Sequence, residues 1–156
     1  MGELVRQLCE RIAARLPMRA ITGIDGSTFL ERYKVLDLGA GVGRLFLHRF
    51  CRGDEDVELH NHPWFGVSLI LVGGYREERR VWAEGGEHVV AYYRRPGSFN
   101  VIAPHTFHRV DLDRGDCWTL FAVGPVVQSW GFWCRWRNTF TPWREFIAQK
   151  GMAPRV

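Results

Sequence analysis

Three histidines in this sequence are spaced so that their imidazoles could form one cluster. His60 and His62 are separated by the single residue Asn61, and His108 lies much further along the chain. Side chains at positions i and i+2 of a β-strand point to the same face, so the pair would place two imidazoles side by side. A third imidazole from a neighbouring strand would complete a cluster of nitrogen donors that suits Zn, Fe, Ni or Cu. The spacing also fits a pair that caps a surface turn, with His108 unrelated to it.

Short β-strands are expected to carry these histidines. Between residues 29 and 137 the chain alternates short runs rich in β-branched and aromatic residues with turns containing glycine, proline and aspartate. Regular spacing of this kind predicts an all-β domain, an antiparallel sandwich or barrel. The predicted strands cover residues 29–38, 44–51, 57–62, 65–72, 75–82, 88–94, 99–103, 107–112, 118–123 and 130–136.

One short helix is predicted at each end of the domain. In residues 1–17, an apolar stripe with four-residue spacing is expected to pack against the domain, and it consists of Leu4, Leu8, Ile12 and Leu16. Pro17 should end this helix. Near the other end, Thr141 is predicted to cap a helix over residues 141–150, with Pro142 at its first position.

The composition is that of a globular protein. The chain has 156 residues, 46% hydrophobic and 13% aromatic, which suits one domain over residues 1–156 with a packed core. No apolar run approaches the length of a membrane span, and the N-terminal segment carries charges throughout, unlike a signal peptide. We therefore expect a cytoplasmic protein that does not bind membranes. The four cysteines have no Cys-x-x-Cys spacing, which argues against a zinc knuckle or a disulfide scaffold.

A glycine-rich stretch over residues 35–46 offers a different interpretation. It resembles the first motif of nucleotide-type methyltransferases, in which a strand runs into a loop that holds S-adenosylmethionine against a helix start. That fold needs a helix after Gly43, whereas residues 44–51 have a strand-like pattern. A hairpin turn explains the glycines equally well, and we favour it.

The histidines belong to a longer pattern that resembles the cupin family of small β-barrels. His60, His62 and Gly74 match that family's first motif, and Gly97 and His108 match its second. The resemblance covers residues 44–125. Within the family, this sequence is similar to a group of small bacterial and phage cupins without an assigned activity. The resemblance implies a cupin-type antiparallel β-barrel, also described as a double-stranded β-helix or jelly roll. It also implies that the three histidines bind a metal ion.

One departure from the cupin pattern matters for chemistry. The family's fourth ligand, a glutamate, would fall at Gly66 or Val67, and neither side chain can bind a metal. The remaining three-histidine site resembles that of cysteine dioxygenase, which leaves coordination positions open for substrate and oxygen. The resemblance implies a divalent transition metal, Fe(II) first, and a mononuclear non-haem Fe(II) dioxygenase for a small polar or anionic substrate. The alternatives are a metal-dependent isomerase or hydrolase that uses Zn, Mn or Ni, and a non-catalytic module that binds or senses a small molecule.

Five further residues are candidates for substrate binding. Two are arginines on expected strands, where an inward guanidinium would bind a carboxylate or phosphate and an outward one would be solvated. His105 lies three residues before His108, so it reaches the site only if the chain bends at Pro104. The remaining two are expected wall residues of the barrel. The candidates are His48, Arg49, His105, Arg109 and Tyr75, whereas His88 is expected at the surface.

The C-terminal run over residues 129–143 is rich in tryptophan, phenylalanine and arginine. Such a run could stack single-stranded nucleic acid, or it could close the barrel and form a dimer interface. We favour the second interpretation and expect a homodimer with no nucleic-acid partner.

Overall fold

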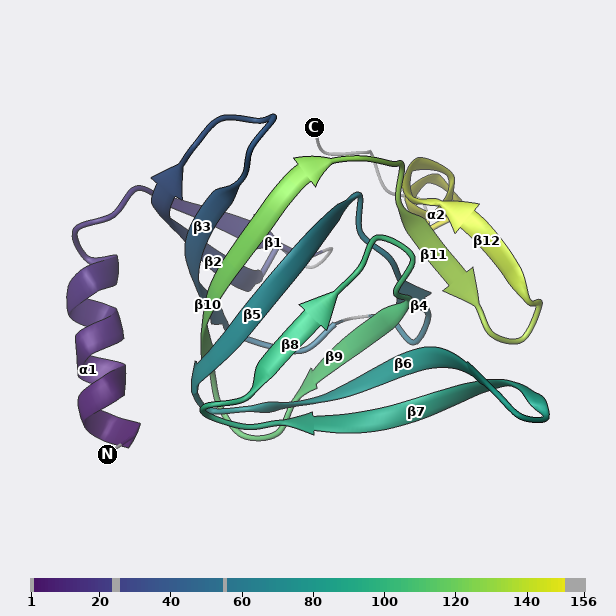
Figure 1. Ribbon diagram of the computed structural model, residues 1–156, viewed down its shortest axis with the longest axis horizontal. Coiled ribbons are helices and arrows are strands. Elements are labelled where there is room, and N and C mark those ends of the chain that lie inside the picture. The colour runs from purple at the N-terminus through teal and green to yellow at the C-terminus, as the bar shows by residue number, and fades with distance from the viewer. Residues whose placement is uncertain (1, 24–25, 55, 151–156) are drawn as a thin grey trace.

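The computed structural model describes residues 2–23, 26–54 and 56–150. Residue 1 and residues 151–156, the two ends of the domain predicted from the sequence, lie outside the described residues. The described part contains two helices and twelve strands (Figure 1). Their bounds are α1 Gly2–Ala13, β1 Met18–Thr22, β2 Thr28–Asp37, β3 Arg44–Phe50, β4 Leu59–His60, β5 Trp64–Val72, β6 Tyr75–Ala83, β7 Gly86–Arg94, β8 Phe99–Ile102, β9 His108–Leu112, β10 Cys117–Val126, β11 Gly131–Cys134, β12 Thr139–Pro142 and α2 Trp143–Gln149.

The strands form two antiparallel six-stranded sheets. The first has the order β1-β2-β3-β10-β5-β8, and the second has the order β12-β11-β4-β9-β6-β7. Strands far apart in the sequence are neighbours in both sheets, as in a jelly roll, and Figure 1 shows the sheets facing one another. The all-β jelly-roll prediction is confirmed.

Side-chain alternation divides the first sheet into an outer and an inner face. On β3, Leu47 packs with Trp118 of β10 in the cluster under α1, so these side chains define the outer face. The next residue on β3, His48, is buried on the opposite, inner face, where it stacks on Phe121 of β10. The inner face therefore carries the polar and aromatic side chains that form the site.

Helix α1 covers the outer face through a different stripe from the one predicted. Cys9 and Ala13 are buried against the sheet, with Val5 packed beside them. The predicted stripe faces solvent instead, because its members Leu4, Leu8 and Ile12 are 72%, 56% and 40% exposed. Both stripes have four-residue spacing, and the one with the smaller side chains lies against Trp118. The predicted contact face was wrong, although the helix packs on the domain.

The glycine-rich stretch is a hairpin turn between β2 and β3. Gly43 adopts a φ of +151°, and a Cβ built there would lie 2.7 Å from the backbone oxygen of Val123. Glycine is required because the turn approaches β10 so closely. A strand, β3, follows directly at Arg44. The methyltransferase alternative, which needs a helix there, is wrong.

Two strands, β1 and β12, were not predicted. β12 affects the C-terminal helix, because Thr141 pairs with Phe132 as a strand residue and Pro142 takes the N-cap position without a side-chain hydrogen bond. The predicted Thr141 cap was therefore wrong, and the helix begins at Trp143. Within the described residues, neither helix has the length and apolar character needed to cross a membrane.

Candidate metal centre

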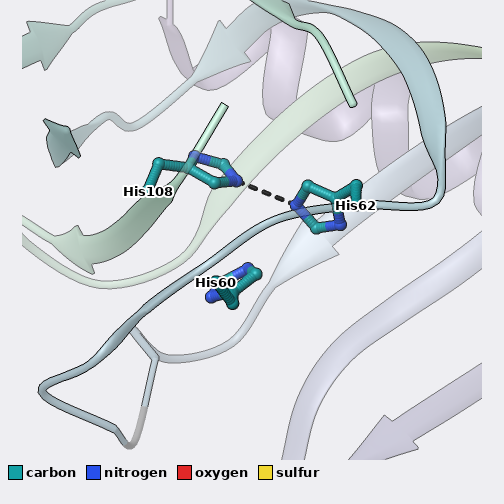
Figure 2. Close-up of side chains that lie close together, drawn as sticks. All are labelled: His60, His62 and His108. Carbon is teal, nitrogen blue, oxygen red and sulfur yellow. Dashed lines mark hydrogen bonds between the residues drawn. The ribbon is translucent and has the colours of Figure 1, made fainter. Parts of the chain in front are cut away.

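The three histidines predicted as ligands meet at one point (Figure 2). His60 lies on β4 and pairs directly with His108 on β9, and His62 follows two residues after His60. The ring centroids are 4.9 Å apart for His60 and His62, 5.0 Å for His60 and His108, and 5.0 Å for His62 and His108. One nitrogen from each ring lies within 4.8 Å of the others. The shortest separation, 2.8 Å, joins the Nε2 atoms of His62 and His108.

The residue between the pair explains why both imidazoles face inward. Asn61 points to the opposite side, where its Oδ1 accepts a hydrogen bond from the backbone N–H of Gly131 (2.8 Å). Its Nδ2 donates to the carbonyl of Pro104 (3.1 Å). These bonds tie the segment to two other parts of the chain. Because neighbouring side chains alternate, fixing Asn61 on one side fixes the histidines on the other.

A fully buried glutamate orients His108. The Nδ1 atom of His108 lies 2.7 Å from Oε1 of Glu77, a residue with 0% exposure. Arg79 and Arg94 form ion pairs with the same carboxylate at 2.9 Å and 2.8 Å. Asn100 donates from Nδ2 to both Glu77 (3.2 Å) and the Tyr75 hydroxyl (2.9 Å). With the His108 proton on Nδ1, the lone pair is on Nε2, which faces His62.

The charges around Glu77 keep it ionised. Burial alone would raise the pKa of Glu77, but the hydrogen bond to His108 and the positive charge of Arg79 lower it to about 2. Glu77 therefore remains a hydrogen-bond acceptor for His108 at neutral pH. The sequence prediction missed this residue, which lies among several arginines on β6 and looks like part of a solvated charged strand.

The other two imidazoles are neutral at physiological pH. Burial lowers the pKa of His60 to about 4, despite the Asp54 carboxylate 4.0 Å from its Nδ1. Burial also holds the pKa of His62 well below its usual value, and the nearby His60 and His108 act in the same direction. Neutral imidazole is the form that binds metal ions. His60 and His62 can therefore bind a metal without first losing protons.

The position of the usual cupin glutamate is closed. Gly66 is buried on the inner face of β5, and a Cβ built on it would lie 2.7 Å from Cζ of Phe121 and 2.9 Å from Cζ3 of Trp64. A side chain would fit there only if these rings moved. The donor set at this point thus consists of three imidazoles, which is suitable for Fe, Zn, Ni or Cu.

The histidines border a cavity of about 480 Å³ between the inner faces of the two sheets. Of the predicted substrate-binding residues, His48 and Tyr75 line it. The sequence prediction missed other lining residues, notably Arg32 on β2, Asp54 before β4, and Trp130 and Phe132 near the C-terminus. Alternation along residues 29–38 could have placed Arg32 on the same face as the buried Leu30.

The other three predicted residues do not line the cavity. Arg49 follows His48 and so faces outward, where it pairs with Asp116 (2.6 Å) and lies over the ring of Trp118. Arg109 follows His108 and points away from the cavity, with Glu78 3.9 Å from it. His105 is exposed in the turn between β8 and β9. Strand alternation explains both arginines, because a strand that turns its histidine inward turns the next residue outward.

Comparisons with known proteins agree with this architecture. No protein-family model and no curated protein matches the sequence. Among solved structures, a cupin-2 domain from Rhodospirillum rubrum superposes with a TM-score of 0.55 at 15% identity, covering 77% of this chain and 76% of that one. The chain has the cupin fold.

Two other cupin-fold structures are enzymes. The DMSP lyase DddQ from Ruegeria pomeroyi gives a TM-score of 0.57 at 14% identity, covering 92% of this chain and 69% of that one. Fe(II)-HppE with an alternative substrate gives 0.54 at 12% identity, covering 72% of this chain and 57% of that one. The present chain therefore spans little more than half of the HppE chain. Similarities at this level of identity establish the fold.

Proposed function

We propose that His60, His62 and His108 bind one divalent transition metal ion, and that this cupin is a mononuclear non-haem Fe(II) dioxygenase for a small polar or anionic substrate. One observation carries the proposal: three imidazoles converge at the wall of a cavity of about 480 Å³, and the ligand group formed by the described residues consists of these three histidines. Three protein ligands leave positions open, which is typical of catalytic rather than structural metal sites.

The spacing of the nitrogens supports a shared ion. Two ligands each about 2.1 Å from one metal, at a right angle to one another, lie about 3 Å apart. The Nε2 atoms of His62 and His108 are separated by 2.8 Å. Bound Fe(II) would supply a site at which dioxygen and substrate meet.

The chain's own residues contribute orientation and exclusion of water. Glu77 fixes His108, and Trp64 stacks on the ring of His62 at a centroid distance of 4.2 Å. Phe121 packs edge-on against Trp64, with ring centroids 5.2 Å apart. This aromatic wall limits water next to the imidazoles and keeps their geometry fixed.

The main alternative uses the same ligands for a different reaction. Zn, Mn or Ni bound by the histidines would act as a Lewis acid in an isomerase or hydrolase. The DMSP lyases among the similar structures favour keeping this candidate, because their names describe bond cleavage rather than oxygenation. A third candidate is a module that binds a small molecule without turnover.

Elemental analysis of the purified protein, followed by oxygen-electrode measurements, separates these candidates. A dioxygenase should contain iron near one equivalent and consume oxygen with its substrate, and chelation should abolish the uptake. A stoichiometric content of zinc, manganese or nickel, with turnover that continues without oxygen, would replace the dioxygenase by the Lewis-acid enzyme. A binding module would retain ligand affinity after chelation.

A further inference from the structure

Arg32 is one of the charged residues that line the cavity beside the histidine cluster, together with Arg52, Asp54 and Asp56. It lies on β2, where it pairs in register with His48 of β3. Its Nε donates a hydrogen bond to Nε2 of His48 (3.2 Å), and its guanidinium lies 5.0 Å from the centre of the Phe46 ring. Arg32 and His48 line the same cavity as the histidine cluster. The guanidinium is thus held by an uncharged ring and an uncharged imidazole.

No carboxylate among residues 2–23, 26–54 and 56–150 forms an ion pair with Arg32. The side chain is half-buried, and burial lowers its pKa, as do the positive charges of Arg19 and Arg44. A charged group withdrawn from water is normally paired, because desolvation without a counter-charge is costly. Arg49, Arg79 and Arg94 follow that rule, since each contacts an aspartate or glutamate. An anion inside the cavity would supply the missing charge for Arg32.

His48 positions this guanidinium rather than competing for the anion. It is buried, and its ring stacks between Phe46 and Phe121 at centroid distances of 5.6 Å and 4.9 Å. Burial holds its pKa well below the usual value, and the neighbouring charge of Arg32 acts in the same direction. The neutral ring accepts the Nε–H of Arg32. The two terminal nitrogens then remain as donors, and their N–H groups match the two oxygens of a carboxylate.

Arg32 shares its cavity with the proposed metal ligands His60, His62 and His108. A ligand bound by Arg32 therefore shares its space with the open side of the histidine cluster. Aromatic rings form much of the cavity wall, including Phe50, Trp64 and Phe121.

We propose that Arg32, positioned by His48, is the anion anchor of the cavity and that the ligand is a small carboxylate with an apolar body. That this ligand is the substrate rests on the proposed metal-dependent function. The anchor itself does not, because it is argued from the geometry of Arg32 and His48. Carboxylate is favoured over a spherical anion because the guanidinium offers a planar pair of donors.

The test uses sodium benzoate and its neutral analogue benzamide as probes. Their binding is followed by ligand-observed NMR titration, in protein as purified and after metal removal by a chelator. Chelation ensures that benzoate cannot bind through the metal. Wild-type protein should bind benzoate at least about tenfold more tightly than benzamide, because a bidentate charge-assisted pair is among the stronger hydrogen bonds.

Two variants with the same change in charge complete the test. Arg32→Gln should lower benzoate affinity about tenfold or more and leave benzamide unchanged. Arg11→Gln, on the exposed side of α1, should bind both probes like wild type. Equal affinities for benzoate and benzamide in wild-type protein would overturn the proposal without any variant. A benzoate preference that survives in Arg32→Gln would overturn it as well, and Arg32→Met replaces that variant if it does not fold.

Metal analysis of the same samples separates this proposal from the preceding one. Wild-type protein without metal, but with an Arg32-dependent preference for benzoate, would end the metal proposal and support the anchor. Metal-loaded protein without that preference would refute the role of Arg32 as an anion anchor and leave the metal proposal intact. Arg32→Gln itself should retain wild-type metal content, because Arg32 contacts none of the three histidines.

Discussion

His108 and Glu77 form a buried pair across neighbouring strands, with Nδ1 of the imidazole 2.7 Å from Oε1 of the carboxylate. The carboxylate is also the counter-charge for Arg79 and Arg94. This one side chain therefore couples the orientation of a proposed metal ligand to the neutralisation of two arginines. A change at Glu77 should affect metal binding and stability together.

Glu77→Gln tests this coupling. We expect metal affinity to fall about 10–100-fold, because a neutral glutamine holds the proton of His108 on Nδ1 less firmly than the Glu77 carboxylate does. The free energy of unfolding should fall by about 3–5 kcal/mol, since two arginines lose their buried partner. Chelator competition and urea denaturation measure the two effects. Glu84→Gln, at an exposed site, serves as the control, and wild-type metal affinity in Glu77→Gln would refute the orienting role.

The stability of the metal-free protein should depend on pH in two ranges. In the folded protein the pKa lies below the ordinary 6.5 for three histidines, His48, His60 and His62, and it is about 4 for His60. Below pH 6.5 the unfolded chain therefore takes up protons at these positions that the folded protein does not. Each such group lowers stability by up to about 1.4 kcal/mol per pH unit as pH falls from 6.5 toward 4. Glu77 adds stability above pH 4.5 that is lost as pH falls toward about 2.

Urea denaturation between pH 7 and pH 4, in the presence of a chelator, measures the upper range. His88→Ala should show the same slope as wild type, because His88 is exposed on β7. A free energy of unfolding that stays constant from pH 7 to pH 5 would show that the three imidazoles are not buried in the neutral form.

Gly66→Ala should destabilise the protein by about 1–3 kcal/mol, because the added methyl group overlaps Phe121 and Trp64. Gly41→Ala is the matched control: a Cβ there meets nothing within 4 Å, and we expect a change within about 0.5 kcal/mol. Thermal or urea denaturation measures both. If Gly66→Glu folded normally and bound metal more tightly, the closed fourth position inferred from the structure would be wrong.

The homodimer expected from the sequence stays a prediction. In the C-terminal run, Trp136 is 81% exposed and Phe140 is 47% exposed. A second exposed apolar surface lies on the outer side of β5 and β8 and consists of Phe65, Phe99 and Val101. Exposed apolar surface of this kind favours association. Light scattering should give twice the chain mass of 18.1 kDa. A strict monomer at high micromolar concentration would contradict it. Salt-sensitive binding to single-stranded nucleic acid would instead revive the stacking interpretation.

Sequence reasoning found the histidine cluster because two of its members depend only on local geometry. His60 and His62 face the same way through strand alternation, whereas His108 was found through the cupin motif. Alternation could have placed Arg32 on the inner face, but its contact with His48 depends on the register between β2 and β3, which the sequence pattern does not give. Strand β1 was missed for a different reason, because its five residues are mostly exposed and lack an alternating pattern.

The central claim is that His60, His62 and His108 hold one metal ion, and metal content in histidine variants tests it most directly. We expect alanine at any of the three positions to remove most bound metal, measured by elemental analysis on folded protein. The fold should persist, because its apolar clusters, such as that of Ile70, Val110 and Cys117, do not involve the imidazoles. His88→Ala should keep wild-type content. Full metal occupancy in the His108→Ala protein would contradict the account.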